Sequence, residues 1–310
     1  MYILLNKIYR GIIPMAEHKI TLDEFNVLAE YERNLGDTAK DFLRMSDSDY
    51  AAVTASLINK GYLADNTITD AGRSVLEPYK VSRAIFMAAG MGSRMVPLTY
   101  VVPKPLVVVR EKRIIETILD AVIEAGIEEI YLIRGYMGEA FNMLKEKYPM
   151  IRLIDNPYYN SANNISSAYV IRDMMAQAYV IESDLVLYNP RIIRKYEYST
   201  NYLGRKTDYT DDWCFKVNEG FVKELLVGGN DVYHMYGISF WNAEDAAKMS
   251  VDIATVFEAE DGKQKYWDEV SMRDCKSHYN IMVKPVYEGD IVEIDSFKEL
   301  QEIDSRYCIG

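Results

Sequence analysis

The sequence predicts an α/β fold built on a mainly parallel sheet, preceded by a small α+β module. From Val81 onward, apolar stretches of strand length alternate with stretches of helical periodicity, which is the order of a parallel sheet with helices on both faces. The residues before Val81 lack this alternation and instead contain two helical segments and a hairpin. We therefore divide the chain into a module of residues 1–80 and a larger domain of residues 81–310.

The N-terminal module begins with a helix after Thr21, and Glu24 stands at capping-box spacing from that residue. A second helix, over residues 46–61, ends at Gly61, a residue type typical of the position just after a helix. Two short strands joined at Asp65–Asn66 and a final short helix follow. This order of helices and hairpin resembles the winged-helix domains of bacterial regulators.

The charge of the chain argues against nucleic acid as a partner. The module has 9 basic and 12 acidic residues, and its second helix offers only Lys60 as a cation. The whole chain has 35 basic and 47 acidic residues and a formal net charge of −12, whereas DNA binding needs Lys and Arg to neutralise phosphates. We expect the module to have a structural or interaction role, contacting a second copy of the chain or another protein.

In the larger domain, strands and helices are expected to alternate up to Asp184. The predicted strands cover residues 83–89, 128–135, 151–156 and 177–185, and the predicted helices cover residues 113–126, 137–149 and 164–175. Antiparallel strands follow, with tight turns predicted at Glu219–Gly220 and at Gly228–Asn230. The sheet is therefore expected to be mixed.

Cysteine spacing and hydropathy indicate where in the cell the protein is expected to lie. Cys214, Cys275 and Cys308 stand far apart and form no Cys-x-x-Cys pair, which argues against a zinc site or a disulfide framework. The first 17 residues contain a short apolar run without a small-residue cleavage site. No segment approaches the ~20 apolar residues of a membrane-spanning helix. We expect reduced thiols, no membrane insertion and a cytoplasmic location.

The connection after the first predicted strand has the composition of a phosphate-binding loop. Gly90 and Gly92 let backbone N–H groups approach an anion closely, and Pro103 and Pro105 restrict the backbone around Lys104. The loop is not a dinucleotide fingerprint, because Met95 stands at the position of the third glycine. It is not a Walker A loop either, because the chain contains no Gly-x-x-x-x-Gly-Lys run followed by Ser or Thr. The alternative is a structural glycine turn beside two surface cations.

The longer pattern is more specific. Ala-Ala-Gly-Met-Gly-Ser-Arg at residues 88–94, Pro-Leu-Thr at residues 97–99 and Pro-Lys-Pro at residues 103–105 closely resemble the signature of nucleotidyltransferases that make activated sugars and alcohols. The resemblance implies a Rossmann-like mixed, mainly parallel sheet of the nucleotide-diphospho-sugar transferase type. It also implies that Arg94 stabilises the leaving pyrophosphate and that Lys104 bridges the two reacting phosphates. The triphosphate would lie in a cradle formed by Ala88, Ala89, Gly90, Met91, Gly92 and Ser93.

Acidic residues at two places are predicted to bind Mg²⁺. Asp184 ends an apolar strand, where parallel sheets place their ligands, and the resembled family has an acidic residue there for the metal. Glu182 stands where that family often has a first Asp, so the metal role is carried over to Asp184 alone. Asp295 would supply a second oxygen ligand, since its Asp-Ser-x-x-x-Leu continuation resembles the closing motif of cytidylyltransferases, without the usual second acid. The alternative for each is a solvated surface carboxylate.

Polar residues in the middle of the domain are expected to read the base of the nucleotide. Asn163, Asn164, Ser166 and Ser167 offer both donors and acceptors, and Asn164 is also suited to cap the helix that follows. The segment resembles the Asn-Asn-x-x-Ser stretch of the phosphocholine cytidylyltransferases of bacterial surface decoration. This resemblance implies CTP as the nucleotide.

Aromatic and acidic residues in later segments indicate the acceptor. Aromatic faces hold a quaternary ammonium by cation–π attraction, worth ~2 kcal/mol or more when desolvated, and nearby carboxylates add long-range attraction. The alternative is that the aromatic residues simply pack in the core. The predicted choline site comprises Asp211, Trp213, Tyr266, Trp267, Asp268 and Glu293.

The sequence thus predicts Mg²⁺-dependent transfer of a cytidylyl group from CTP to phosphocholine, giving CDP-choline and pyrophosphate. The resemblance covers about residues 83–306 and leaves the N-terminal module outside it. Two alternatives stay open. The acceptor is a sugar-, alditol- or ethanolamine-phosphate, or the chain is a transcriptional regulator that senses CTP or choline.

Overall fold

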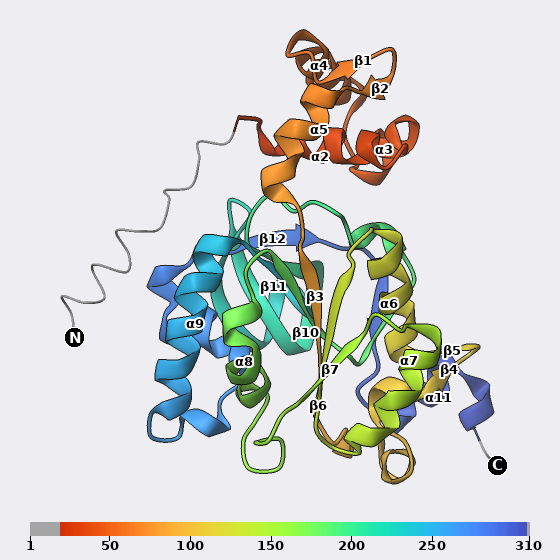
Figure 1. Cartoon of the computed structure of the whole chain (residues 1–310), viewed down its shortest axis with the longest axis vertical. Coiled ribbons are helices and arrows are strands. Elements are labelled where there is room, and N and C mark those ends of the chain that lie inside the picture. The colour runs from red at the N-terminus through yellow and green to blue at the C-terminus, as the bar shows by residue number, and fades with distance from the viewer. Residues whose placement is uncertain (1–18, 309–310) are drawn as a thin grey trace. The chain divides into compact units, whose positions relative to one another are not determined.

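The computed structural model describes residues 19–308, which form two compact units (Figure 1). The small unit takes the chain up to Lys80 together with Tyr196–Tyr198, and the large unit takes Val81–Lys195 and the residues from Ser199 onward. The first 17 residues, for which no signal peptide was expected, lie outside the described residues. Within residues 19–308, no helix combines the length and the apolar character needed to cross a membrane.

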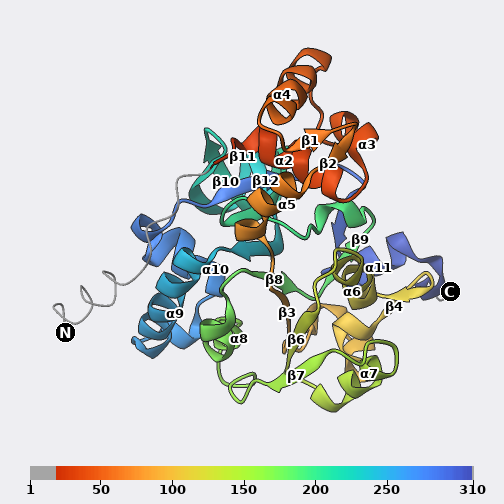
Figure 2. The ribbon, with the colours of Figure 1, turned by 45° about the horizontal axis from the view of Figure 1, so that its top comes forward.

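The small unit is helical, with one short hairpin. Its helices are α2 (Leu22–Glu32), α3 (Gly36–Phe42), α4 (Asp47–Asn59) and α5 (Asp70–Leu76), and its strands are β1 (Leu63–Ala64) and β2 (Thr67–Ile68) (Figure 2). The predicted capping box forms, because Thr21 and Glu24 each accept the backbone N–H of the other. Asp65 and Asn66 make the predicted turn, with φ of 49° and 58°. Helix α3 was not predicted from the sequence, and the likeness to a winged helix stays a prediction.

A segment from the middle of the sequence completes the core of the small unit. The ring of Tyr198 stacks on that of Tyr79, with centroids 5.5 Å apart, and lies 5.3 Å from that of Phe25. The backbone N–H of Glu197 donates to the carbonyl of Tyr79 over 2.9 Å. Tyr196 is also buried in this core, at 3% exposure. The two units divide at Lys80 and Val81, and Tyr196–Tyr198 join the small unit from the middle of the chain.

The large unit is built on a seven-stranded mixed sheet. Strands β3, β6, β7 and β8 run parallel, and β11 runs antiparallel to β8. The order across the sheet is β10-β12-β11-β8-β3-β6-β7. The strands are β3 (Arg83–Ala88), β6 (Glu129–Arg134), β7 (Arg152–Asp155), β8 (Ala178–Glu182), β10 (Asn201–Asn218), β11 (Phe221–Trp241) and β12 (Met282–Pro285).

Helices cover both faces of this sheet, as the alternating pattern predicts. Alternate residues of β3 point to opposite faces, so Phe86 packs with α6 (Ile114–Glu124) while Ile85 packs with α8 (Ile165–Ile171) and α9 (Ala243–Glu258). Figure 1 shows α6 and α7 (Leu144–Lys147) on one side and α8 and α9 on the other. Both faces are apolar, which explains the continuous apolar runs of the parallel strands.

Short elements complete the large unit. They are β4 (Val108–Val109), β5 (Lys112–Arg113), β9 (Leu185–Leu187), β13 (Ile291–Glu293), α10 (Trp267–Glu269) and α11 (Phe297–Ile303). Strand β13 pairs antiparallel with β9 and sets Glu293 opposite Leu185. The backbone N–H of Ile294 donates to the carbonyl of Asp184 over 3.2 Å. This pairing brings the late carboxylates of the chain beside Asp184.

One predicted turn is wrong. The turn at Glu219–Gly220 forms, but residues 228–230 lie inside the long strand β11. Gly228 has φ of +72°, and the pairing register with β10 shifts between Thr210 and Trp213. The glycines therefore permit an irregular, bulge-like pairing inside the strand, which is another position where glycine is common.

Candidate active site

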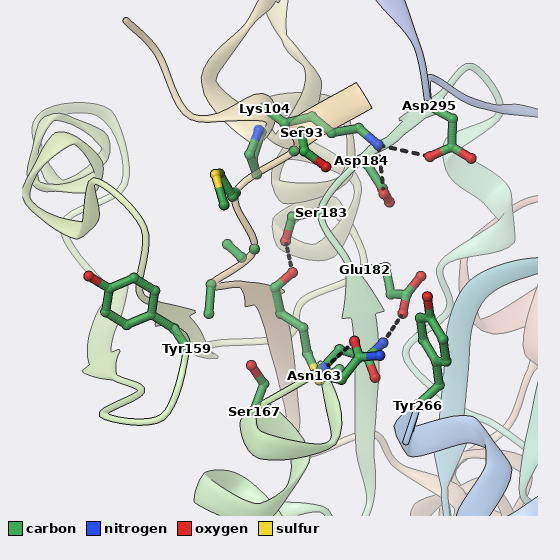
Figure 3. A pocket seen from close by; sticks show the side chains of 18 of the residues that line it. Ser93, Lys104, Tyr159, Asn163, Ser167, Glu182, Ser183, Asp184, Tyr266 and Asp295 are labelled. Atoms are coloured by element: carbon green, nitrogen blue, oxygen red, sulfur yellow. Dashed lines mark hydrogen bonds and ion pairs between the residues drawn. The ribbon is translucent and has the colours of Figure 1, made fainter. Parts of the chain in front are cut away.

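A pocket of about 650 Å³ opens where β3 and β8 end, the edge at which parallel sheets place ligands (Figure 3). The glycine loop, the start of α8, the end of β8 and the β13 segment all contribute to its wall. All the predicted site residues line it except Asp211 and Trp267. The pocket thus joins segments as far apart in the sequence as Arg94 and Asp295, which are separated by 201 positions.

Within the glycine loop, Gly92 lies so close to its neighbours that a side chain there would force them to shift. Gly92 has φ of +64°, and a Cβ there would lie 3.0 Å from Cβ of Lys104 and 3.2 Å from Cγ2 of Thr99. The Thr99 hydroxyl donates to the carbonyl of Gly92 over 3.0 Å and so fixes the loop. Backbone groups of the loop therefore line the pocket directly, as an anion cradle requires.

Lys104 stands at the centre of the charged end of the pocket. Its Nζ lies 3.0 Å from Oδ2 of Asp184 and 3.0 Å from Oδ1 of Asp295 (Figure 3). Arg94 donates from Nη2 to the same Asp295 oxygen over 2.7 Å. Burial of Lys104, only 7% exposed, disfavours its charge, but the two carboxylates offset this and its pKa is raised above the ordinary value.

Three carboxylates at this end have the chemistry of a divalent-cation site. Asp184, Glu293 and Asp295 each place an oxygen within 4.8 Å of the others. Oδ1 of Asp184 is buried and has no hydrogen-bond partner, which leaves a lone pair for a ligand. Burial, and then repulsion from Asp184 and Asp295, raises the pKa of Glu293 well above its usual range. Hard oxygen ligands in this number fit Mg²⁺.

The Asn-Asn segment is held in place by its own side chains. Asn164 donates from Nδ2 to Oε1 of Glu182 over 3.2 Å and accepts the backbone N–H of Trp267 over 2.9 Å. Asn164 occupies the N-cap position of α8, as predicted, but its side chain makes no capping hydrogen bond to the helix. Asn163 donates from Nδ2 to the carbonyl of Gln264 over 3.1 Å. These bonds tie the start of α8 to β8 and to the segment before α10.

The two predicted serines are buried residues of the pocket wall. Asn156, which follows β7, donates from Nδ2 to the hydroxyl oxygens of Ser166 and Ser167 over 2.9 and 3.1 Å. The Ser166 hydroxyl donates to the carbonyl of Asn163 over 2.8 Å. Both serines line the pocket and also fix the first turn of α8. Sequence reasoning missed Asn156, although its place just after a strand is the usual signal for a site residue.

Of the three aromatic residues predicted for the choline site, two line the pocket and one is buried in the core. Trp213 and Tyr266 line the pocket, with ring centroids 5.3 Å apart and planes inclined at 60°. Trp267 does not: it is 1% exposed and packs against Trp241 and Tyr202, with centroids 6.0 and 6.1 Å away. Its place in the choline site is therefore wrong, because α10 turns its ring toward the core.

The acidic residues of the acceptor segments separate in the same way. Asp211 is exposed and does not line the pocket, whereas Asp212, the next residue, does. The sequence cannot tell which of two adjacent aspartates faces inward. Asp268 lines the pocket at 3% exposure and accepts a hydrogen bond from the Tyr202 hydroxyl. Burial raises the pKa of Asp268 to about 6.

Three further residues of the wall carried no predicted role. Glu182 is hydrogen-bonded to Asn164, and burial raises its pKa well above the usual range. Tyr159 packs so closely on Gly135 that a Cβ at Gly135 would lie 2.5 Å from Cβ of Tyr159 and 2.6 Å from its Cγ. Met235 comes from β11. The close approach at Gly135 is visible only in the structure, since no spacing in the sequence relates these two residues.

Comparison with known proteins extends these observations. Residues 83–198 match the nucleotidyl transferase family. The chain is 36% identical over 230 residues to the 2-aminoethylphosphonate cytidylyltransferase of Lancefieldella rimae, a match covering 73% of this chain and 93% of that protein. It is 31% identical over 223 residues to the choline-phosphate cytidylyltransferase of Streptococcus pneumoniae, covering 72% of this chain and 96% of that protein.

Solved structures agree with these matches. The CTP:phosphocholine cytidylyltransferase of Streptococcus pneumoniae is similar with a TM-score of 0.67 at 31% identity, covering 72% of this chain and 98% of that one. The inositol-1-phosphate CTP transferase of T. maritima shares the fold alone, with a TM-score of 0.57 at 15% identity. Because the relatives are matched over more than nine tenths of their length, the likeness extends across their whole fold. The chain belongs to the cytidylyltransferases of the nucleotidyl transferase family.

Proposed function

We propose that this cytidylyltransferase transfers the cytidylyl group of CTP to phosphocholine, giving CDP-choline and pyrophosphate, with Mg²⁺ as the cofactor. The observation that carries the proposal is the composition of the pocket at the ends of β3 and β8. One end holds the glycine loop, Lys104 and three carboxylates, and the other holds Trp213 and Tyr266 beside Asp212 and Asp268. The first end suits a triphosphate with its cation, and the second suits a cationic amine.

In this proposal the acceptor phosphate attacks the α-phosphorus of CTP in line and displaces pyrophosphate. The acceptor is already a nucleophile, so the residues of the pocket position the groups and neutralise charge. Arg94 and Lys104 stabilise the negative charge that moves to the pyrophosphate. Asp184, Glu293 and Asp295 would hold Mg²⁺, which supplies charge neutralisation on the phosphates.

A second acceptor, 2-aminoethylphosphonate, is favoured by two observations. Trp267 lies in the core, so two aromatic rings instead of three face the amine end of the pocket. Carboxylates stand there too, and a primary ammonium donates hydrogen bonds to carboxylates, which the methyl groups of choline cannot do. In addition, the similar protein from Lancefieldella rimae is a 2-aminoethylphosphonate cytidylyltransferase. Sugar and alditol phosphates fit less well, because they lack the cation that this end attracts.

The test measures pyrophosphate release with Mg²⁺, crossing the four nucleoside triphosphates with phosphocholine, phosphoethanolamine, 2-aminoethylphosphonate and several sugar 1-phosphates. Release with CTP and phosphocholine at the highest kcat/KM supports the proposal. A higher kcat/KM with 2-aminoethylphosphonate replaces the acceptor and keeps the rest. No release with any pair, from protein shown to be folded, overturns the proposal and favours a nucleotide sensor.

A further inference from the structure

A second cluster of metal-ligating side chains lies in the large unit, outside the pocket. Asp252 on α9, Cys275 and His278 each place one ligand atom within 4.8 Å of the others. None of them lines the pocket described above. The absence of a Cys-x-x-Cys pair argued against a zinc site. That argument did not consider Cys275 and His278, a Cys-x-x-His pair to which the fold adds the distant Asp252.

The protein brings these three residues together by local folding of one turn. The backbone N–H of Cys275 donates to the carbonyl of Val270 over 2.8 Å, and that of His278 donates to the carbonyl of Cys275 over 2.9 Å. The turn therefore presents the thiol and the imidazole on one side, facing α9. Lys248, on the same helix, donates to the carbonyl of His278 over 3.3 Å and fastens the turn from outside.

We propose that Asp252, Cys275 and His278 form a site for one Zn²⁺ ion, separate from the carboxylates of the pocket. Thiolate, imidazole and carboxylate are the three protein ligands that zinc accepts, and three such ligands leave the fourth tetrahedral position to water. A thiolate and a carboxylate together balance the two charges of the ion. Softer ligands of this kind select zinc over the Mg²⁺ that all-oxygen sites prefer.

The surroundings of Asp252 are those of a supported ligand. Its side chain is 8% exposed, and the Tyr279 hydroxyl donates to Oδ2 over 2.6 Å. A ligating carboxylate is commonly held by such an outer hydrogen bond. The ring of Tyr279 packs against that of Trp241, with centroids 5.8 Å apart, so the hydroxyl is itself fixed.

The Zn²⁺ ion would replace the hydrogen bond that His278 makes to Asp252. Nδ1 of His278 lies 2.7 Å from Oδ2 of Asp252, whereas two ligands of a tetrahedral zinc stand about 3.3 Å apart. The imidazole must therefore withdraw by roughly half an ångström. His278 is 46% exposed and has room to do so. Binding releases the thiol proton of Cys275 to solvent, and the proton that Nδ1 of His278 shares with Asp252 is replaced by one on Nε2, so that the neutral imidazole ligates through Nδ1.

The experiment uses Co²⁺ as a spectroscopic substitute for zinc on the full-length protein, after chelator treatment and dialysis. Coordination by Cys275 produces a thiolate-to-cobalt charge-transfer band, which the carboxylates of the pocket cannot produce. We expect this band to saturate at one equivalent and to disappear when Zn²⁺ is added. Absence of the band at saturating Co²⁺ overturns the proposal without any variant and leaves the cluster as a hydrogen-bonded contact only.

Variants assign the ligands. Cys275→Ser should abolish the band, while Cys308→Ser, which changes an exposed cysteine elsewhere, should keep it. Asp184→Asn should also keep it, because that residue belongs to the pocket. Tyr279→Phe should weaken Zn²⁺ binding by about 10- to 100-fold. A band that survives Cys275→Ser, or that is lost in Cys308→Ser, places the metal elsewhere and overturns the proposal.

Discussion

The ammonium group of Lys104 lies 3.0 Å from Oδ2 of Asp184, although 80 positions separate the two residues. Asp295 accepts from the same ammonium over 3.0 Å. In the free enzyme Lys104 thus neutralises two carboxylates that the proposed Mg²⁺ would otherwise neutralise. In the proposed mechanism the bound cation would take over the neutralisation of Asp184 and Asp295, and the ammonium of Lys104 would then be free to contact phosphate oxygens.

Replacing Lys104 should affect both turnover and stability. We expect Lys104→Ala to lower turnover by about 100-fold or more, as loss of a preorganised electrostatic stabiliser does. It should also lower the unfolding temperature, since Asp184 and Asp295 then repel each other, and added Mg²⁺ should restore much of that loss. Pyrophosphate release and thermal unfolding with and without Mg²⁺ measure the two effects. Lys112→Ala, which breaks an exposed ion pair with Asp120, is the control, and near-normal turnover in Lys104→Ala would contradict the assignment.

Gly92 offers a test of the phosphate loop with a matched control. Gly92→Ala places a side chain at φ of +64° and 3.0 Å from Cβ of Lys104, so we expect the KM for CTP to rise by about tenfold or more. Gly220→Ala imposes similar backbone strain at φ of +81° with no atom within 4 Å of the new Cβ. Each change should cost roughly 1 to 2 kcal/mol of stability. Equal KM values for CTP in the two variants would count against the loop's role.

Trp213 and Trp267 should respond differently to substitution. Trp213→Ala removes a wall of the amine end, and we expect the KM for phosphocholine to rise by about tenfold or more with that for CTP unchanged. Trp267→Ala empties a core site and should cost about 3 to 5 kcal/mol of stability. Trp267→Phe keeps the fold and should leave both KM values within a few-fold. Steady-state kinetics and urea unfolding measure these quantities, and a selective rise in the acceptor KM for Trp267→Phe would restore Trp267 to the acceptor site.

The raised pKa of Asp268 should make the free energy of unfolding decrease as the pH rises. Its pKa is raised to about 6 in the native protein, from 3.8 in the unfolded chain, so the native state holds the extra proton between these values. Its contribution to the free energy of unfolding therefore falls as pH rises toward 7. Asp268→Asn removes this term, so we expect the variant to gain about 1 kcal/mol relative to the unsubstituted protein between pH 5 and pH 7.5.

Urea unfolding at the two pH values checks this expectation. Asp261→Asn is the matched control, because Asp261 is exposed and its positive φ of 60° suits asparagine equally well. A gain of the same size in the control would show that the effect does not arise at Asp268.

The parts of the site that could be predicted from the sequence are local ones. The glycine loop and Lys104 lie within twenty positions of each other, and Asp184 ends an apolar strand, so pattern and position sufficed. Asp295 was predicted only through a family resemblance, because the β9–β13 pairing that brings it to Asp184 leaves no mark on spacing.

The sequence could not predict which of two neighbouring side chains faces the pocket. Tyr266 and Trp267 are adjacent and both aromatic, yet one lines the pocket and the other is buried, since the first turn of α10 sends them to opposite sides. Asp211 and Asp212 separate in the same way beside an irregular pairing of β10 with β11. Glycine at positions 228 and 229 was equally compatible with a turn and with a bulged strand.

The contribution of Tyr196–Tyr198 to the small unit has a consequence for synthesis. The ribosome makes the chain from its N-terminus, so residues 19–80 emerge first, but the stack of Tyr198 on Tyr79 cannot form until the 115 residues from Val81 to Lys195 have also been made. At ordinary elongation rates this delay is roughly 10 s. Residues 19–80 are therefore translated before Val81–Lys195, yet the core that they form is completed only after that segment has been made.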